Sequence, residues 1–511
     1  MTSTLLRNGR IATLAGAAGR PEHGGTAGPV ISELTVIDAV VSAPVERPDR
    51  VVDLGGALVT PAFVDTHVHA TSAGLALAGL DLTGCGSLPE LLRAVAGHAA
   101  RHPDVAVLWG HGWDETRWPQ RRPPTRAELD DTTGGRPAYL SRVDVHSAAV
   151  TTALAAGATG LAGYSPTGPL TRAAHHAVRR AALTAIPAAQ RRGVQRAFLD
   201  HAASLGIGSL HECAGPDISG LDDLRDLLAL AGPAIVPYWG EPAADAEQAR
   251  FLLAASGAHG LAGDLFCDGA IGSRTAALHE PYADAPESTG HTYLTAEAIG
   301  AHVAACTVAG VQAGFHLIGD AATAAVVEGF AIAEREVGRA ALARRRHRLE
   351  HLEMIDAGQA AALARWGVVA SVQPGFDRCW GGSDGMYATR LGTGRAAAMN
   401  PFAMLAAAGV ELAFGSDAPV TELGPWLAVE AAVRHRTPAS ALGPAAALAA
   451  HTVGGHRAAA DPNPLAGTLA EGAPASYAVW DTDRLPDLDG GRPPRCLHTV
   501  VDGETIFGGE S

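Results

Sequence analysis

The sequence contains no lysine, since all 38 of its basic residues are arginine. A site that depends on a carboxylated lysine as a bridge between two metal ions is therefore excluded. Acidic residues outnumber the basic ones, 53 to 38, and the formal charge of −15 argues against a nucleic-acid partner.

Long apolar runs are missing as well. No segment approaches the roughly 18 uninterrupted apolar residues of a membrane span, and the start of the chain lacks the apolar core of a secretory signal. The six cysteines are scattered and form no CxxC pair, which is typical of reduced thiols. We therefore expect a cytoplasmic protein with no membrane partner.

The 511 residues suffice for a full barrel and an accessory module. Strand-like segments occupy both ends of the chain and indicate a small discontinuous β module, with strands expected at 5–11, 32–37, 50–54, 475–480 and 496–506. In between, apolar runs alternate with helix-like segments, as in a parallel barrel or sheet. The apolar runs are 106–108, 207–211, 265–267, 311–316, 368–372 and 412–415, and helices are expected at 89–100 and 295–308.

Residues 110–175 interrupt this alternation. They contain Trp113, Trp118, a Pro/Arg cluster at 119–126 and Gly-rich turns near 156–169. We interpret this region as an insertion after the first barrel strand that covers the functional site.

Two histidines follow the strand-like run 57–64. His67 and His69 are two residues apart, so on a strand they point to the same side and can bind one metal ion. His316, His351 and Asp417 lie far downstream, each directly after or within a strand-like segment. Because a barrel keeps its active site at the carboxyl ends of its strands, the five residues together predict one metal site.

Each residue alone has a simpler interpretation. His-x-His pairs occur by chance, and a lone histidine such as His316 after an apolar run is usually a core residue. His351 also fits a solvated helix face, and Asp417 a helix N-cap. Their occurrence in this order, at the spacing of barrel units, favours the metal site.

These segments resemble the amidohydrolase superfamily, and within it the YtcJ-like branch, also called amidohydrolase family 3. The resemblance extends from about residue 50 to the C-terminus, and its motifs lie at 61–69, 110–114, 124–130, 142–146, 268–274, 316–320, 348–351 and 415–420. It implies an α/β fold with a (β/α)8 TIM-like barrel at 57–455, carrying the insertion at about 72–175. A small β-sandwich domain would be formed by both termini, 1–56 and 456–511.

The resemblance also implies a divalent metal, with zinc as the first candidate, and hydrolysis of an amide-type bond. His67 and His69 would bind the metal from the first barrel strand, His316 from the fifth, His351 from the sixth and Asp417 from the eighth. Asp417 would accept the proton of the attacking water and return it to the leaving nitrogen. The metal or His351 would polarise the scissile carbonyl.

Asp264 marks a departure from the family, because many relatives have the bridging lysine at this position. Either Asp264 bridges two ions itself, or the site holds one ion and His351 acts as a proton donor beside it. One ion is favoured over two, because Asp264 is several bonds shorter than a carboxylated lysine. Glu212 is a second candidate bridge, and a salt bridge at the barrel mouth is its simpler interpretation.

Five further residues are candidates for substrate contacts: Trp113, Asp114, His146, Arg274 and Arg348. The alternatives are packing of the insertion for the first three and structural ion pairs for the arginines. We expect a small-molecule hydrolase such as an N-acyl or N-formyl amine deacylase. An aminohydrolase acting on a ring C–N bond and a non-catalytic metal-binding homologue are the alternatives, and the resemblance is compatible with a homodimer.

Overall fold

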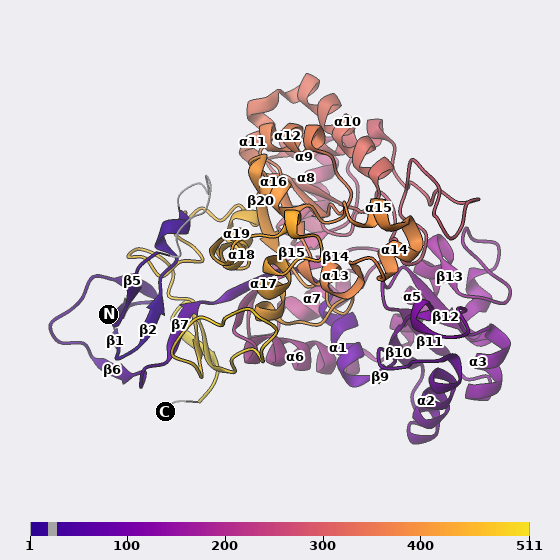
Figure 1. Cartoon of the computed structure of the whole chain (residues 1–511), viewed down its shortest axis with the longest axis horizontal. Coiled ribbons are helices and arrows are strands. Elements are labelled where there is room, and N and C mark those ends of the chain that lie inside the picture. The colour runs from indigo at the N-terminus through magenta and orange to yellow at the C-terminus, as the bar shows by residue number, and fades with distance from the viewer. Residues whose placement is uncertain (1, 19–27, 510–511) are drawn as a thin grey trace.

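A computed structural model describes residues 2–18 and 28–509, which form a central barrel with a β module on one side and an insertion on the other (Figure 1). The barrel is an eight-stranded parallel sheet. Its strands are β8 (Phe63–Val68), β14 (Ile207–Ala214), β15 (Ala234–Trp239), β16 (Gly260–Leu261), β17 (Gln312–Leu317), β18 (Arg348–His351), β19 (Val369–Val372) and β20 (Glu411–Phe414). A parallel bridge between Val68 and Ala418 joins its two edges, so the barrel is nearly closed. The expected (β/α)8 barrel is confirmed.

Helices surround this sheet, and every residue of β8 and β14 is buried because one face meets the barrel interior and the other the helices. The helices that follow or flank the barrel strands are α1 (Ala70–Ala78), α6 (Ala188–Ser204), α7 (Leu221–Leu228), α8 (Ala246–Ser256), α9 (Ala296–Ala309), α10 (Asp320–Val337), α11 (Arg339–Arg345), α12 (Ala357–Arg365), α13 (Pro374–Trp380), α14 (Met386–Leu391), α15 (Thr393–Ala396), α16 (Phe402–Ala407), α17 (Pro425–Val433), α18 (Pro444–Ala450) and α19 (Val453–Ala458). None of the helices in the described ranges combines the length and the apolar character needed to cross a bilayer.

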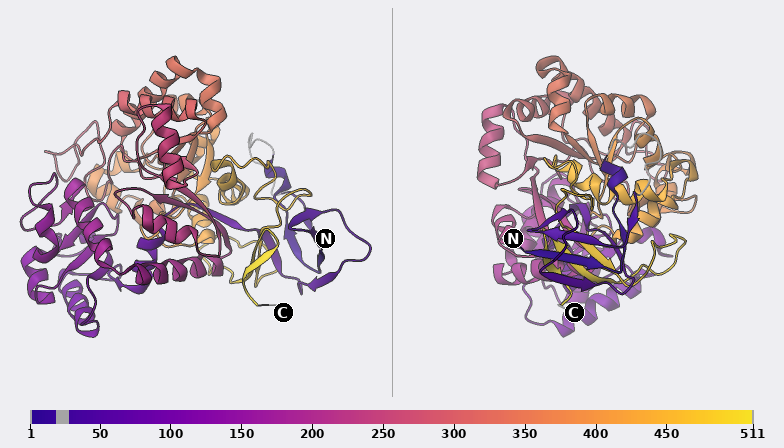
Figure 2. Two further views of the ribbon diagram at one scale, coloured as in Figure 1. Left: turned by 180° about the vertical axis from the view of Figure 1, so that it is seen from behind. Right: turned by 90° about the vertical axis from the view of Figure 1, so that its left-hand side faces the viewer.

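Both ends of the chain contribute to the β module, which lies beside the barrel together with both termini (Figures 1 and 2). A four-stranded sheet contains β1 (Ser3–Arg7), β4 (Leu34–Ile37), β5 (Val40–Ser42) and β6 (Arg50–Asp53). In a six-stranded sheet, β21 (Tyr477–Trp480) lies between two strands from opposite ends of the chain, β7 (Leu58–Pro61) and β22 (Cys496–Val501). Its other members are β2 (Arg10–Ala12), β3 (Val30–Ile31) and β23 (Glu504–Phe507).

The insertion after the first barrel strand forms a sheet of its own, drawn in purple at the lower right of Figure 1. It has five strands: β9 (Leu80–Asp81), β10 (Leu108–Trp113), β11 (Ala138–Arg142), β12 (Ser147–Val150) and β13 (Leu170–Thr171). The helices α2 (Leu88–Arg101), α3 (Arg126–Thr133), α4 (Thr152–Ala155) and α5 (Arg172–Ala185) belong to the same region. Ser87 caps α2 by accepting from the Glu90 backbone N–H, as expected for a helix beginning there.

Four strand expectations need correction. The run 106–108 precedes and enters β10, so it belongs to the insertion and not to the barrel. The run expected at 265–267 is an isolated bridge from Phe266 to His316, and the barrel strand β16 lies earlier. The run 5–11 divides into two strands because Asn8 turns the chain with φ of 56°. The expectation also omitted β15, a strand with the sequence AIVPYW.

Candidate metal centre

The predicted ligand residues all lie at the carboxyl ends of barrel strands. His67 is in β8 with His69 directly after it, His316 is in β17, and His351 is the last residue of β18. Asp417 follows β20 by three residues. Parallel strands of a barrel end at one rim, so segments separated by hundreds of residues meet there.

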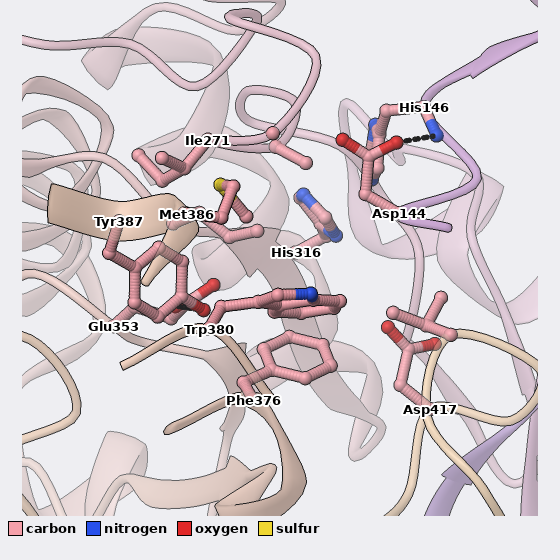
Figure 3. Close-up of a pocket in the computed structure, with 14 residues that line it drawn as sticks. Asp144, His146, Ile271, His316, Glu353, Phe376, Trp380, Met386, Tyr387 and Asp417 are labelled. Atoms are coloured by element: carbon pink, nitrogen blue, oxygen red, sulfur yellow. Dashed lines mark hydrogen bonds between the residues drawn. The ribbon is translucent and has the colours of Figure 1, made fainter. Parts of the chain in front are cut away.

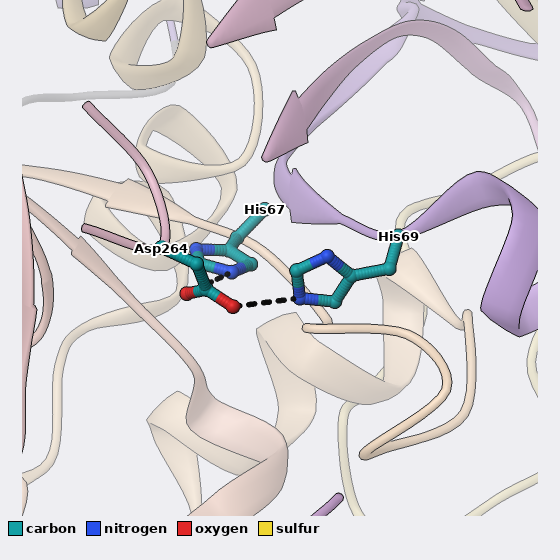
Figure 4. Close-up of side chains that lie close together, drawn as sticks. All are labelled: His67, His69 and Asp264. Carbon is teal, nitrogen blue, oxygen red and sulfur yellow. Dashed lines mark ion pairs between the residues drawn. The ribbon is translucent and has the colours of Figure 1, made fainter. Parts of the chain in front are cut away.

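Asp264 lies at the centre of this group. Its Oδ1 atom is 3.4 Å from His67 Nε2, and its Oδ2 atom is 3.4 Å from His69 Nε2 (Figure 4). Oδ1 also lies 3.5 Å from His316 Nδ1 and 4.0 Å from His351 Nε2. The short side chain therefore reaches histidines from three different strands. Its length therefore does not keep Asp264 from the histidines, and the number of ions stays a prediction.

A glycine places Asp264 there. Gly263 has φ of +76°, and a Cβ atom at this position would lie 2.9 Å from Cys213 Cβ and 3.0 Å from its Sγ. Only glycine combines this conformation with so close an approach. The chain consequently leaves β16 early and turns the next residue toward the histidines.

Asp417 faces the same histidines from the other side. Its Oδ1 atom is 3.2 Å from His69 Nε2 and 3.5 Å from His67 Nε2. Asp417 and His351 both have left-handed backbone conformations, with φ of 55° and 69°. Such conformations are unfavourable for residues with a side chain and cluster at functional sites, where the surrounding structure enforces them.

Four side-chain atoms at this point are buried and have no hydrogen-bond partner in the described part of the chain: His67 Nε2, Asp264 Oδ1, His316 Nδ1 and His351 Nε2. Each such atom normally costs folding free energy, and native proteins contain few of them. Here the four converge, and imidazole nitrogen with carboxylate oxygen is the donor set of a divalent metal such as zinc. The residues present therefore fit a metal site.

The remaining ring nitrogens are held by protein acceptors. His67 Nδ1 donates to Glu350 Oε2 at 3.0 Å, His69 Nδ1 to the Cys213 carbonyl at 3.1 Å, and His351 Nδ1 to Gln373 Oε1 at 2.8 Å. Each contact orients its ring and leaves the Nε2 lone pair free for a ligand bond.

The ligand histidines differ in protonation behaviour. Neighbouring acidic groups, Asp264 among them, raise the pKa of His67, His69 and His316 despite their burial, so a metal would have to displace protons from these rings. Burial and the neighbouring charge of His316 lower the pKa of His351 to about 3, so its ring is neutral at pH 7. Burial raises the pKa of Asp264, but the charge of His69 and the close approach of His316 and His67 outweigh it and hold the pKa well below its ordinary value. A neutral imidazole and an ionised carboxylate are the forms that bind metal.

Glu212 has a different role. Its Oε2 atom accepts from the Ala70 backbone N–H at 2.8 Å, and burial raises its pKa to about 7. Among the residues that the structure describes, it joins no group of potential metal ligands and forms no salt bridge.

Arg348, a candidate for substrate contact, lies inside the barrel. Its side chain is fully buried, donates to both oxygens of Glu350, and stacks over Tyr238 at 4.2 Å from the ring centre. It supports the carboxylate that orients His67 and does not face the pocket described below.

Three other candidates for substrate contact form structural contacts elsewhere in the fold. Trp113 is buried against Trp118, and its indole N–H donates to the Leu140 carbonyl at 2.8 Å. Asp114 accepts from Arg142 at 2.8 Å, and Arg274 forms a two-point ion pair with Asp284 at 2.7 and 3.0 Å. The insertion does reach the site, but through Asp144 and His146.

A pocket opens beside the ligand residues, with His316 and Asp417 in its lining (Figure 3). His146 also lines it, with its ring centre 5.0 Å from that of His316. The opposite walls come from α13 and α14, which contribute Phe376, Trp380, Met386 and Tyr387, and from Glu353 after β18. The sequence interpretation did not identify these five, because no local pattern distinguishes them from core residues.

Comparison with known proteins is consistent with this arrangement. A family model described as "Amidohydrolase family" matches residues 50–507. The chain is 26% identical over 509 residues to the amidohydrolase YtcJ of Bacillus subtilis (strain 168), covering 89% of this chain and 90% of that protein. It is 29% identical over 103 residues to an N-substituted formamide deformylase of Arthrobacter pascens, a match that covers 20% of this chain and 19% of that one. The crystal structure of a metal-dependent hydrolase from Pyrococcus horikoshii OT3 superposes with a TM-score of 0.72 at 23% identity, covering 96% of this chain and 100% of the other.

Proposed function

Because the chain belongs to the amidohydrolase family, we propose that it hydrolyses a non-peptide carbon–nitrogen amide bond in a small molecule, as an N-acyl or N-formyl amine deacylase does. The observation that carries the proposal is the convergence of four buried, unpartnered ligand atoms beside Asp417 at a pocket. The partial similarity to a formamide deformylase supports the choice of an N-formyl or N-acyl amine.

The ligands form two groups that share Asp264. One group is His67, His69 and Asp264, and the other is Asp264, His316 and His351. We propose that each group would hold one divalent ion, and Asp264 is the residue that the two groups have in common. Ions bound there would supply Lewis acidity and lower the pKa of a coordinated water toward neutrality.

The chain's own residues move the protons. Asp417 lines the pocket and touches the first ligand group, so its carboxylate can accept a proton from the attacking water and return it to the leaving nitrogen. Burial lowers the pKa of His146 well below its ordinary value, so its ring is neutral and can donate one N–H to the substrate carbonyl oxygen. His351 is turned toward Asp264, which makes it a ligand in this proposal and not the proton donor.

Metal content tests the shared carboxylate. Wild-type protein, Asp264→Asn and His67→Ala would be reconstituted with zinc, dialysed and analysed by plasma mass spectrometry. We expect about two ions per chain in the wild type and fewer in both variants, since ligand loss weakens binding by about 10-fold or more. One ion per chain in the wild type, unchanged in Asp264→Asn, would show that Asp264 bridges nothing.

Product analysis tests the reaction. Metal-loaded protein would be incubated with N-formyl and N-acetyl amines, and the released acid and amine would be measured. Release of both in equal amounts supports the proposal. Ammonia release from ring substrates alone would favour an aminohydrolase, and metal-loaded protein that hydrolyses neither class would overturn the proposal.

A further inference from the structure

The pocket wall opposite the ligand residues is apolar and aromatic. Phe376 and Trp380 project from α13, with ring centres 4.9 Å apart, and Met386 and Tyr387 project from α14 (Figure 3). The cavity has an empty volume of ≈ 300 Å³ including the space open to solvent. Aromatic and aliphatic side chains of this kind typically line the sites that bind apolar parts of small molecules.

One carboxyl group interrupts this wall. Glu353 is only 2% exposed and lines the pocket. Its Oε2 atom accepts from the Tyr387 hydroxyl and from Asn400 Nδ2, the latter at 3.4 Å, whereas its Oε1 atom has no hydrogen-bond partner in the described part of the chain. Because Glu353 lines the pocket, a ligand bound there can bring a donor to this oxygen.

The same pocket has no arginine among its described lining residues. The nearest arginines are already engaged: Arg142 with three carboxylates, Arg390 with two carboxylates and the Gly272 carbonyl, and Arg274 with Asp284. A carboxylate on the substrate would therefore lie beside Asp144 and Glu353 without an arginine to pair with it. Placing an unpaired charge in such a site is unfavourable.

We propose that this pocket selects amides of neutral aryl-alkylamine type, with one ring against Trp380 and Phe376 and a hydrogen-bond donor on the ring directed to Glu353. Amides that carry a carboxylate, such as N-acylamino acids, are rejected. The inference depends on the proposed function in one respect: it assumes that the scissile amide lies beside Asp417. The aromatic wall and the Glu353 acceptor define the part of the substrate that does not react.

Three matched probes test the proposal: N-formyltyramine, N-formylphenethylamine, which lacks the ring hydroxyl, and N-formyltyrosine, which adds a carboxylate. Dissociation constants would be measured by calorimetry with metal-loaded Asp417→Asn, in which turnover should be blocked, and kcat/KM with the wild type. We expect N-formyltyramine to bind about 2- to 10-fold more tightly than N-formylphenethylamine, the range for one additional hydrogen bond. N-formyltyrosine should bind at least about 10-fold more weakly than N-formyltyramine.

Variants assign the preference to Glu353. Glu353→Leu removes the acceptor and should abolish the difference between the first two probes, while Glu353→Gln restores an acceptor oxygen and part of the difference. Tyr387→Phe is the matched control, because it removes a partner of Glu353 but leaves the acceptor, so the preference should remain.

The proposal would be overturned if N-formyltyramine and N-formylphenethylamine bound equally, or if N-formyltyrosine bound as tightly as N-formyltyramine. Neither comparison depends on whether Glu353→Leu folds. The expected binding order without any hydrolysis in the wild type would support the pocket assignment while refuting the proposed function. Hydrolysis of all three probes with equal kcat/KM and equal affinity would support the proposed function while refuting the pocket assignment.

Discussion

Replacement of Arg348 tests how the metal centre is held in place. The fully buried guanidinium donates from Nε to Glu350 Oε1 at 2.5 Å and from Nη2 to Oε2 at 2.9 Å. Glu350 in turn accepts from His67 Nδ1. Burial raises the pKa of Glu350, but the charge of Arg348 outweighs it and holds the pKa well below its ordinary value. Arg348→Met would therefore leave an unpaired carboxylate directly behind a ligand histidine.

Two magnitudes follow from this geometry. Removing one partner of a buried ion pair costs about 3–5 kcal/mol of unfolding free energy, because the other charge remains buried. Disturbing the residue that orients a ligand histidine weakens metal binding by about 10- to 100-fold. Both effects should occur together in Arg348→Met, since one guanidinium serves both purposes.

Denaturant unfolding of the metal-free protein measures the first effect, and competition with a chromophoric chelator measures the second. The double variant Arg348→Met/Glu350→Leu is the control, because it removes both charges. It should regain part of the lost stability but not the metal affinity, since His67 then has no acceptor. If Arg348→Met retains wild-type stability and metal affinity but raises KM, the guanidinium binds substrate and the structural assignment is wrong.

Two further outcomes are expected. Asp417→Asn should retain metal while kcat falls by about 10²- to 10⁴-fold, the range for loss of a proton-transfer group; near-normal turnover with full metal content would contradict its assignment. His302 is buried, with Nδ1 accepting from the Ala243 N–H and Nε2 donating to the Leu261 carbonyl, and burial lowers its pKa to about 4. Its neutral form stabilises the fold fully above pH 6.5, and this contribution falls as the pH drops toward 4, by about 2 kcal/mol between pH 7.5 and 5.0. His302→Gln, which takes up no proton, should lose correspondingly less stability over that interval in denaturant unfolding of the metal-free protein, whereas equal losses would refute the assignment.

The fold could be predicted where short patterns carry the information. Strand-like segments at both ends predicted a shared β module, and the structure joins β2 with β21 and β22 in one sheet. Alternating apolar runs and helix-like segments predicted the barrel. The strand at 265–267 was misplaced because the positive φ of Gly263, and not hydropathy, decides where the chain leaves β16.

The chemical identity of the centre was largely determined by sequence. His67 and His69 on one strand, followed in order by His316, His351 and Asp417, are residue types with few other uses at strand ends, and parallel strands must end at a common rim. The absence of lysine likewise excludes the usual bridge from the sequence alone.

Tertiary structure alone decided which side chains reach that centre and which serve other purposes. Asp264 reaches histidines from three strands, Arg348 lies behind His67, and the pocket walls come from α13 and α14. Direction and reach depend on how strands and helices from distant parts of the chain pack together. Local sequence specifies an element and its buried face, but the distance between two side chains is set by the whole fold.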